Sequence, residues 1–270
     1  MKLLRRICRC AGLFCWFSAA GIYTMIVNRR RGWPGRRRAA EITRVWAAVA
    51  ARIAGLRIHV HGDASAFAGG LVVSNHQGYL DIPVHASAFQ LRFAPKAEMR
   101  YWPFLGWIVG LNRPVWIDRS SRQKSREVAD EIAETLRERI SMVVYPEGTS
   151  TDGKHGLLPF KSTPFEAAVA AGAPILPVIT FFRCESEDPG GPLAWFGDAE
   201  LLPHIWRILG LRRIDADLYL LDPVTPRPGE ERKELADRIR EKMNETYWRI
   251  RNGDETPLVE RHSRSVGDAV

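Results

Sequence analysis

Short apolar runs alternate with helical segments from residue 71 onward, and this alternation restricts the chain to few folds. Five runs have the composition of buried strands: LVVS (71–74), LRFAPK (91–96), MVVYPEG (142–148), PILPVITFF (174–182) and ADLYLLDPV (216–224). Segments with helical periodicity separate or follow them, at about 82–89, 127–140, 164–171 and 230–252. Strands that are apolar on both faces and alternate with helices form parallel sheets covered by helices. We therefore predict an α/β fold: a single domain with a mostly parallel central sheet flanked by helices.

Three other segments complete the predicted organisation. RIHVHGD (57–63) alternates like a strand, and no carboxylate or cysteine lies near His59 and His61 at a spacing that suits a metal site. We expect these histidines on a solvated or edge face rather than at a metal. Residues 185–211 are rich in Gly, Pro and Trp without a clear period, which predicts a loop or surface insertion. The predicted limits are 1–56 for an N-terminal anchor and amphipathic helical segment, 57–252 for the main domain and 253–270 for a loose tail.

The positive charge of the chain is concentrated at its N-terminus. The formal net charge is +8, yet residues 1–38 carry ten Lys and Arg residues and no acid, so the remainder is close to neutral. A neutral main domain lacks the basic footprint of nucleic-acid binding. The four cysteines are Cys8, Cys10, Cys15 and Cys184, and they provide neither a disulfide framework nor a zinc spacing. We expect no metal and no bound cofactor.

An uncharged segment, AGLFCWFSAAGIYTMIV (11–27), lies between the basic groups. As a helix it would reach roughly 26 Å, slightly less than the hydrocarbon core of a bilayer at about 30 Å. It fits a membrane span with snorkelling arginines, a helix partly embedded in the interface, a signal peptide or a core helix. The three arginines that follow favour a retained anchor, with the main domain on the cytoplasmic side of the membrane.

The octet SNHQGYLD (74–81) holds the first candidate for chemistry. His76 follows an apolar strand and lies five residues before Asp81. On one helix the two side chains would point apart, so they pair only if a turn brings His76 back over the helix start. Asp81 would then fix the imidazole tautomer and make His76 a general base. By itself the octet also fits a helix cap beside an uninvolved histidine.

Two further segments carry polar groups that suit a lipid ligand. VVYPEGTSTDGKHGLLPFK (143–161) leads from a strand into Glu147, Gly148 and Thr149 and ends at Lys161, as in loops that bind phosphate or an oxyanion, although a plain turn has the same composition. Lys96 and Arg119 bracket an apolar, aromatic stretch. Cations beside apolar surface suit an anionic head and an acyl tail, but core aromatics with surface cations would look alike.

Together these segments resemble the glycerolipid acyltransferase family typified by bacterial 1-acylglycerol-3-phosphate acyltransferase. NHQGYLD is similar to the family block NHxxxxD, YPEGT to the third block and APILPV to the fourth, while KAEMRYWPFLGWIVGLNRPVWIDR resembles the second. The resemblance implies acyl transfer from acyl-CoA or acyl-carrier protein to a lysolipid hydroxyl, giving phosphatidate from 1-acyl-sn-glycerol-3-phosphate, with His76 and Asp81 catalytic. It further implies an acyltransferase domain at 57–252 and substrate-binding roles for Lys96, Arg119, Glu147, Gly148, Thr149, Ser150, Lys161 and Pro177.

One departure from the family pattern leaves the acceptor open. The third block of the family usually reads EGTR, and here Ser150 replaces the arginine that is expected to bind the acceptor phosphate. EGTS resembles the branch that includes lyso-ornithine lipid acyltransferases. A membrane-anchored thioester hydrolase and a non-catalytic lipid-binding protein are the remaining alternatives. The sequence contains no G-x-S-x-G nucleophile elbow, so a hydrolase would lack the usual serine.

Overall fold

The computed structural model describes residues 1–29, 31–64, 67, 69–118, 120–184, 191–253 and 263–265. Its strands are β1 (Leu56–His61), β2 (Leu71–Ser74), β3 (Leu91–Phe93), β4 (Ser141–Val144), β5 (Ile175–Cys184), β6 (Ile214–Leu220) and β7 (Ser263–Ser265). Its helices are α1 (Lys2–Val27), α2 (Gly32–Ala54), α3 (Asp81–Ala88), the 3-10 helix η2 (Ala97–Tyr101), α4 (Leu105–Leu111), α5 (Arg122–Arg137), α6 (Thr163–Ala171), α7 (Leu201–Ile208) and α8 (Arg232–Arg251).

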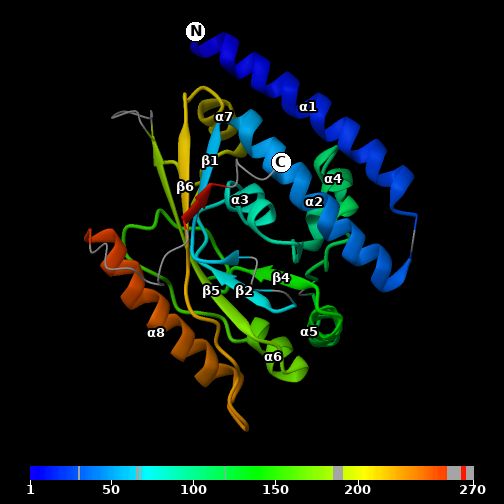
Figure 1. Ribbon diagram of the computed structural model, residues 1–270, viewed down its shortest axis with the longest axis vertical. Helices are drawn as coiled ribbons and strands as arrows, with labels where there is room; N and C mark the ends of the chain where they lie inside the picture. Colours follow the sequence, from blue (N-terminus) through cyan, green and yellow to red (C-terminus); the bar gives the residue numbers. More distant parts are fainter. Residues whose placement is uncertain are drawn as a thin grey trace.

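The strands form one sheet in the order β3-β4-β2-β5-β6-β1-β7 (Figure 1). Neighbours from β3 to β5 are parallel, as are β6 and β1, whereas β5–β6 and β1–β7 are antiparallel. The predicted mixed α/β fold with a mostly parallel sheet is confirmed. The predicted domain limits at residues 56 and 252 stay a prediction.

Helices cover both faces of the sheet, which explains why its central strands are apolar throughout. Leu71 and Val73 of β2 pack into a core with α5, α6 and α8. Val72 points the other way, into a core with α2 and α3. Because successive strand residues face opposite sides, a strand buried on both faces loses the polar alternation of an exposed one.

The N-terminal helices pack against each other and against the main domain (Figure 1). Trp16 of α1 donates from Nε1 to the carbonyl of Trp46 in α2 over 3.1 Å. Phe14 stacks on Phe104, just before α4, with ring centroids 5.1 Å apart. Among the described residues, α1 is the one helix long and apolar enough to cross a membrane, by length and composition.

One prediction about local structure was wrong, and another was incomplete. Residues 201–208 form the helix α7 inside the segment predicted to be a loop, and residues 185–190 of that segment lie outside the described residues. His59 and His61 have carboxylate partners that the sequence did not indicate: their Nε2 atoms lie 2.8 and 2.9 Å from Asp215 and Asp217 of β6. The predicted loose tail falls mostly outside the described residues, and its residues 263–265 form β7 beside β1.

Candidate active site

The loop between β2 and α3 brings His76 onto the start of α3. His76 Nδ1 lies 2.6 Å from Asp81 Oδ2. The same oxygen accepts hydrogen bonds from the backbone N–H groups of Gln77 (2.7 Å) and Gly78 (3.0 Å). The Asp81 carboxylate therefore holds the loop in a tight turn. This turn is the one that a His and an Asp five residues apart need in order to pair.

The two partners of this pair differ in how deeply they are buried. The Asp81 side chain is 0% exposed and the His76 side chain is 24% exposed. A carboxylate only accepts hydrogen bonds, so the proton of the neutral imidazole resides on Nδ1 and the lone pair on Nε2, on the far side of the ring. Asp81 Oδ1 is buried without a hydrogen-bond partner among the described residues. The arrangement is a neutral base backed by a buried, incompletely compensated negative charge.

Glu147 ties this loop to the PEGTS segment that follows β4. Its Oε1 accepts from the backbone N–H of His76 (3.0 Å), and its Oε2 accepts from that of Leu158 (2.9 Å). Burial raises the pKa of Glu147, while these two backbone hydrogen bonds act in the opposite direction. A further bond runs from Thr151 N–H to the carbonyl of His76 over 2.9 Å. Glu147 thus braces the backbone of His76 rather than facing solvent.

Lys161 lies over the turn that follows Glu147. Gly148 has a φ of +74°, a backbone conformation that favours glycine, and a Cβ placed on it would come within 2.4 Å of Lys161 Nζ. The backbone N–H of Lys161 donates to Pro146 over 2.8 Å. Thr149 is exposed and Ser150 half-buried. The structure therefore brings Lys161 against Gly148, next to Glu147, which binds the backbone of His76.

Of the three remaining predicted residues, two lie in other elements of the described chain and one lies outside it. Lys96 is exposed and is the N-cap of η2, just after β3. Because β3, β4 and β2 are parallel, Lys96 and His76 both lie beyond the carboxyl ends of these strands. Pro177 is buried inside the sheet, in β5 opposite Val73. Arg119 lies outside the described residues. Substrate contacts of all three stay predictions.

Tyr145 and His85 support His76 from inside the protein, and the sequence did not single them out. The Tyr145 ring stacks on His76 with centroids 4.2 Å apart and an interplanar angle of 17°. His85 Nδ1 lies 2.8 Å from the Asp81 carbonyl and 3.1 Å from the Tyr145 hydroxyl, and its Nε2 lies 3.2 Å from Thr180 Oγ1. Burial lowers the pKa of His85, so this ring stays neutral. The sequence does place His85 four residues after Asp81, on the same face of the helix, and this spacing could have indicated its role.

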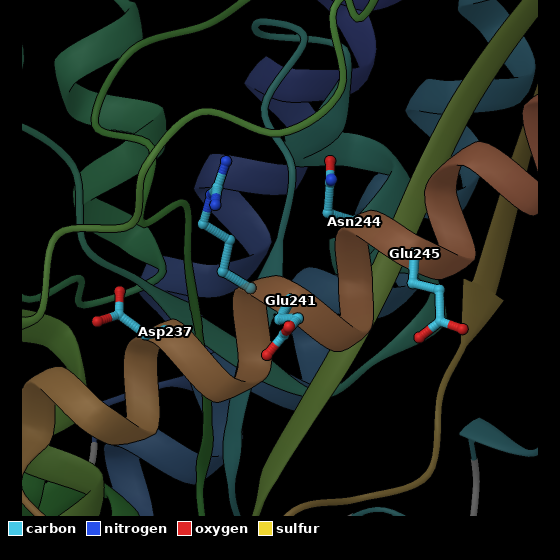
Figure 2. A pocket seen from close by; sticks show the side chains of 5 residues that line it. Asp237, Glu241, Asn244 and Glu245 are labelled. Atoms are coloured by element: carbon cyan, nitrogen blue, oxygen red, sulfur yellow. The ribbon is translucent and has the colours of Figure 1, made fainter.

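A surface hollow elsewhere contains no predicted site residue. It is lined by the α8 side chains Asp237, Arg240, Glu241, Asn244 and Glu245 (Figure 2). Asn244 accepts from the backbone N–H of Leu157 over 3.0 Å, and Arg240 donates to the carbonyls of Leu157 and Leu158. These contacts hold the loop whose Leu158 N–H binds Glu147, so α8 supports the site from behind.

Comparison with known proteins gives consistent matches. The family model described as acyltransferase matches residues 57–180. The chain is 34% identical to a lyso-ornithine lipid O-acyltransferase of Brucella abortus, over 78% of this chain and 82% of that protein. It is 29% identical to a 1-acyl-sn-glycerol-3-phosphate acyltransferase of Neisseria gonorrhoeae, over 89% of this chain and 91% of that protein.

A crystal structure supports the fold. The 1-acyl-sn-glycerophosphate acyltransferase of Thermotoga maritima superposes with a TM-score of 0.66 and 19% sequence identity, over 96% of this chain and 98% of that one. At this identity the likeness shows the fold alone. The matched part of the chain includes the N-terminal helices as well as the sheet.

Proposed function

The chain belongs to the acyltransferase family, and we propose that it transfers a fatty acyl group from a thioester donor, acyl-CoA or acyl-carrier protein, to the free hydroxyl of a lysolipid. The observation that carries this proposal is the His76–Asp81 pair, in which Nδ1 is held at 2.6 Å and Nε2 is left for a substrate. No bound cofactor is needed for this chemistry.

The geometry supports a direct transfer. His76 Nε2 removes the hydroxyl proton of the acceptor as its oxygen attacks the thioester carbonyl. Asp81 is buried and one of its oxygens is unpaired among the described residues, so it stabilises the imidazolium that forms. When the tetrahedral intermediate collapses, the C–S bond breaks and the imidazolium returns its proton to the leaving thiolate. Lys161, above the turn at Gly148, is placed to hold an anionic group of a substrate.

The test replaces His76 with Ala and uses His59→Ala as a matched control. Both histidines bind a carboxylate at 2.6–2.8 Å, but His59 lies on β1. Loss of a general base lowers the rate by about a hundredfold or more. We expect that loss for His76→Ala and near-normal transfer for His59→Ala, measured with labelled acyl-CoA and lysolipid. Substantial transfer by His76→Ala would overturn the mechanism, and equal donor consumption without lysolipid would indicate a hydrolase.

Two lysolipids are candidate acceptors. 1-Acyl-sn-glycerol-3-phosphate, which would give phosphatidate, fits the Neisseria relative, and Lys161 supplies a cation for its phosphate. A lyso-ornithine lipid fits the Brucella relative, and Ser150, which leaves the usual arginine position uncharged, favours it. A panel of both acceptors with one labelled donor separates the two.

The lipid acceptor also requires membrane association, and we propose that α1 lies in the interface instead of spanning the bilayer. Arg9 donates to the carbonyls of Leu209 (3.2 Å), Leu211 (2.5 Å) and Arg212 (2.9 Å), and Arg5 donates to Gly210 over 2.9 Å. A helix fixed to the main domain at its first turns, and packed along α2, has its exposed apolar face available to lipid. The catalytic domain would then lie at the cytoplasmic face of a bacterial inner membrane.

A further inference from the structure

The helix α7 is apolar on its exposed face as well as on its buried one. A helix on a water-exposed surface normally buries its apolar side chains and exposes its charged ones. In α7 the buried face contains Ile208, 2% exposed, and the polar His204, 7% exposed, while Leu202 is 76% and Trp206 40% exposed. The neighbouring Pro203 is exposed as well. The exterior of α7 therefore consists of apolar side chains, an arrangement that water alone does not favour.

The buried face of α7 is attached to the loop that carries His76. His204 Nε2 donates to the carbonyls of Pro192 (3.2 Å) and Ala194 (3.1 Å), so its Nδ1 accepts from the Tyr79 hydroxyl over 2.9 Å. Tyr79 lies two residues before Asp81. A second link runs from the backbone N–H of Trp195 to the carbonyl of Gln77 over 2.7 Å. The position of α7 is thereby tied to that of the His76–Asp81 loop.

Cations gather at the C-terminal end of α7. The Arg6 guanidinium lies 5.5 Å from the centre of the Trp206 ring. Arg5 and Arg9 donate to backbone carbonyls of residues 209–212, and within the described part of the chain neither forms an ion pair with an acid. Arg212 is exposed in the same place. The acids flanking α7, Asp198 and Glu200, precede its other end.

From this arrangement we infer that α7 is a second membrane-contacting element, beside α1. Its exterior enters the boundary between head groups and acyl chains of an anionic bilayer, and the arginines around Trp206 bind lipid phosphates. The first turns of α1 lie beside α7 (Figure 1). Arg6 of α1 contacts Trp206, and the neighbouring Leu3, Leu4 and Ile7 are exposed. Through Tyr79, α7 fixes the height of His76 relative to the bilayer in which the acceptor is dissolved. This consequence rests on the proposed function, whereas the contact with lipid does not.

The experiment measures binding of the full chain to vesicles of phosphatidylcholine with or without phosphatidylglycerol. The variant Leu202→Ser/Trp206→Ser removes the apolar exterior of α7. Val169→Ser is the control, because Val169 is also exposed, at 37%, but lies on α6. We expect the double variant to bind anionic vesicles about tenfold more weakly or worse, since two apolar side chains no longer leave water, and the control to bind normally. Arg6→Gln should reduce the preference for anionic vesicles.

A second readout does not depend on weakened binding. Trp206→Phe keeps an aromatic side chain, so it should bind vesicles as the unchanged chain does. Lipids with brominated acyl chains should quench a smaller part of its tryptophan fluorescence, because Trp206 no longer contributes. Unchanged quenching in Trp206→Phe, together with normal binding of the double variant, would overturn the inference, as would equal losses in the double variant and the α6 control.

Acyl transfer by the unchanged chain in the same vesicles separates this inference from the proposed function. If the unchanged chain binds vesicles through α7 but transfers no acyl group to any lysolipid, the proposed function fails and the lipid contact stands. If it transfers acyl groups and the double variant binds and reacts normally, the lipid contact of α7 fails and the proposed function stands.

Discussion

At the scale of single residues, Tyr145 fixes the orientation of the base. Its ring stacks on His76 at 4.2 Å, and its hydroxyl lies 3.1 Å from the buried His85. In Tyr145→Leu the imidazole loses its stacking partner. We expect kcat to fall about ten- to a hundredfold with little change in KM, because a misplaced base slows the reaction more than it weakens substrate binding. Tyr145→Phe keeps the ring and should keep most of the rate.

Steady-state kinetics of the two Tyr145 variants, together with their melting temperatures, check this prediction. Equal losses of kcat in the Leu and Phe variants would contradict a role for the ring and assign the effect to the hydroxyl and His85. A large drop in melting temperature that parallels the loss of rate would mark a structural role instead.

Ser150 is the residue at which acceptor choice is tested. Its neighbour Thr151 binds the carbonyl of His76 over 2.9 Å, so position 150 lies near the reacting groups. An arginine there would offer two parallel hydrogen bonds to a phosphate. We expect Ser150→Arg to raise the rate with 1-acyl-sn-glycerol-3-phosphate relative to lyso-ornithine lipid by about tenfold, the size of one charge-assisted hydrogen bond. Ser150→Gln is the uncharged control, and an unchanged ratio would mean that position 150 does not contact the head group.

At the scale of elements, β1 and β6 are joined by pairs of side chains as well as by the backbone. Asp217 accepts from His61 (2.9 Å) and twice from Arg183 (3.0 and 2.7 Å). Burial by itself would raise the pKa of Asp217, but the hydrogen bonds from His61 and Arg183 outweigh it and lower that pKa from 3.8. A lowered folded pKa stabilises the folded state above the unfolded pKa, and this stabilisation is lost as the pH falls through the folded pKa.

Asp217→Asn should therefore destabilise the protein in a pH-dependent way. We expect the free energy of unfolding to fall by about 1–3 kcal/mol at neutral pH, because the replacement breaks buried, charge-assisted hydrogen bonds. The difference from the unchanged chain should hold down to about pH 4 and shrink below it. Urea unfolding at several pH values measures both quantities, and a difference that stays constant in acid would show that the carboxylate charge is not the cause.

Elements with a strong local signal could be predicted from the sequence. The strand β2 is apolar at consecutive positions because both of its faces are covered. The helix α6 begins next to Pro164 and ends at Gly172, which has a φ of +58°. The helix α7 could not be predicted in the same way, because it is short and its buried face holds the polar His204. Its pattern fits a lipid boundary better than a water boundary.

Side-chain pairs between strands that are distant in the chain could not be predicted from the sequence. The His76–Asp81 pair could be proposed because its spacing is local, and its geometry follows from one turn. The partners in the His59–Asp215 pair are 156 residues apart, and only the parallel register of β1 and β6 brings them together. The stacking of Tyr145 on His76 likewise requires β2 and β4 to be neighbours.

At the scale of the whole molecule, basic residues flank α1 at both of its ends. Lys2, Arg5, Arg6 and Arg9 lie in its first turns, and arginines occupy positions 29–31 just after it. If α1 spanned the bilayer, one of these groups would face the outer side, contrary to the tendency of basic segments to stay in the cytoplasm. It would also have to give up the contacts of Arg5 and Arg9 with residues 209–212. An interfacial position keeps all of these groups on the side of the main domain.

We therefore expect both ends of α1 to lie on the same side of the membrane as His76. A short protease-sensitive tag placed before Met1 should be cleaved in sealed inverted membrane vesicles, in which the cytoplasmic face is outward, and protected in right-side-out vesicles. A second tag after Val270 reports the side of the main domain in the same preparations. Opposite accessibility of the two tags would show that α1 spans the bilayer. Because a spanning α1 cannot hold Arg9 against Leu211 near the end of α7, that outcome would also require the N-terminal helix to leave the position it has in this structure.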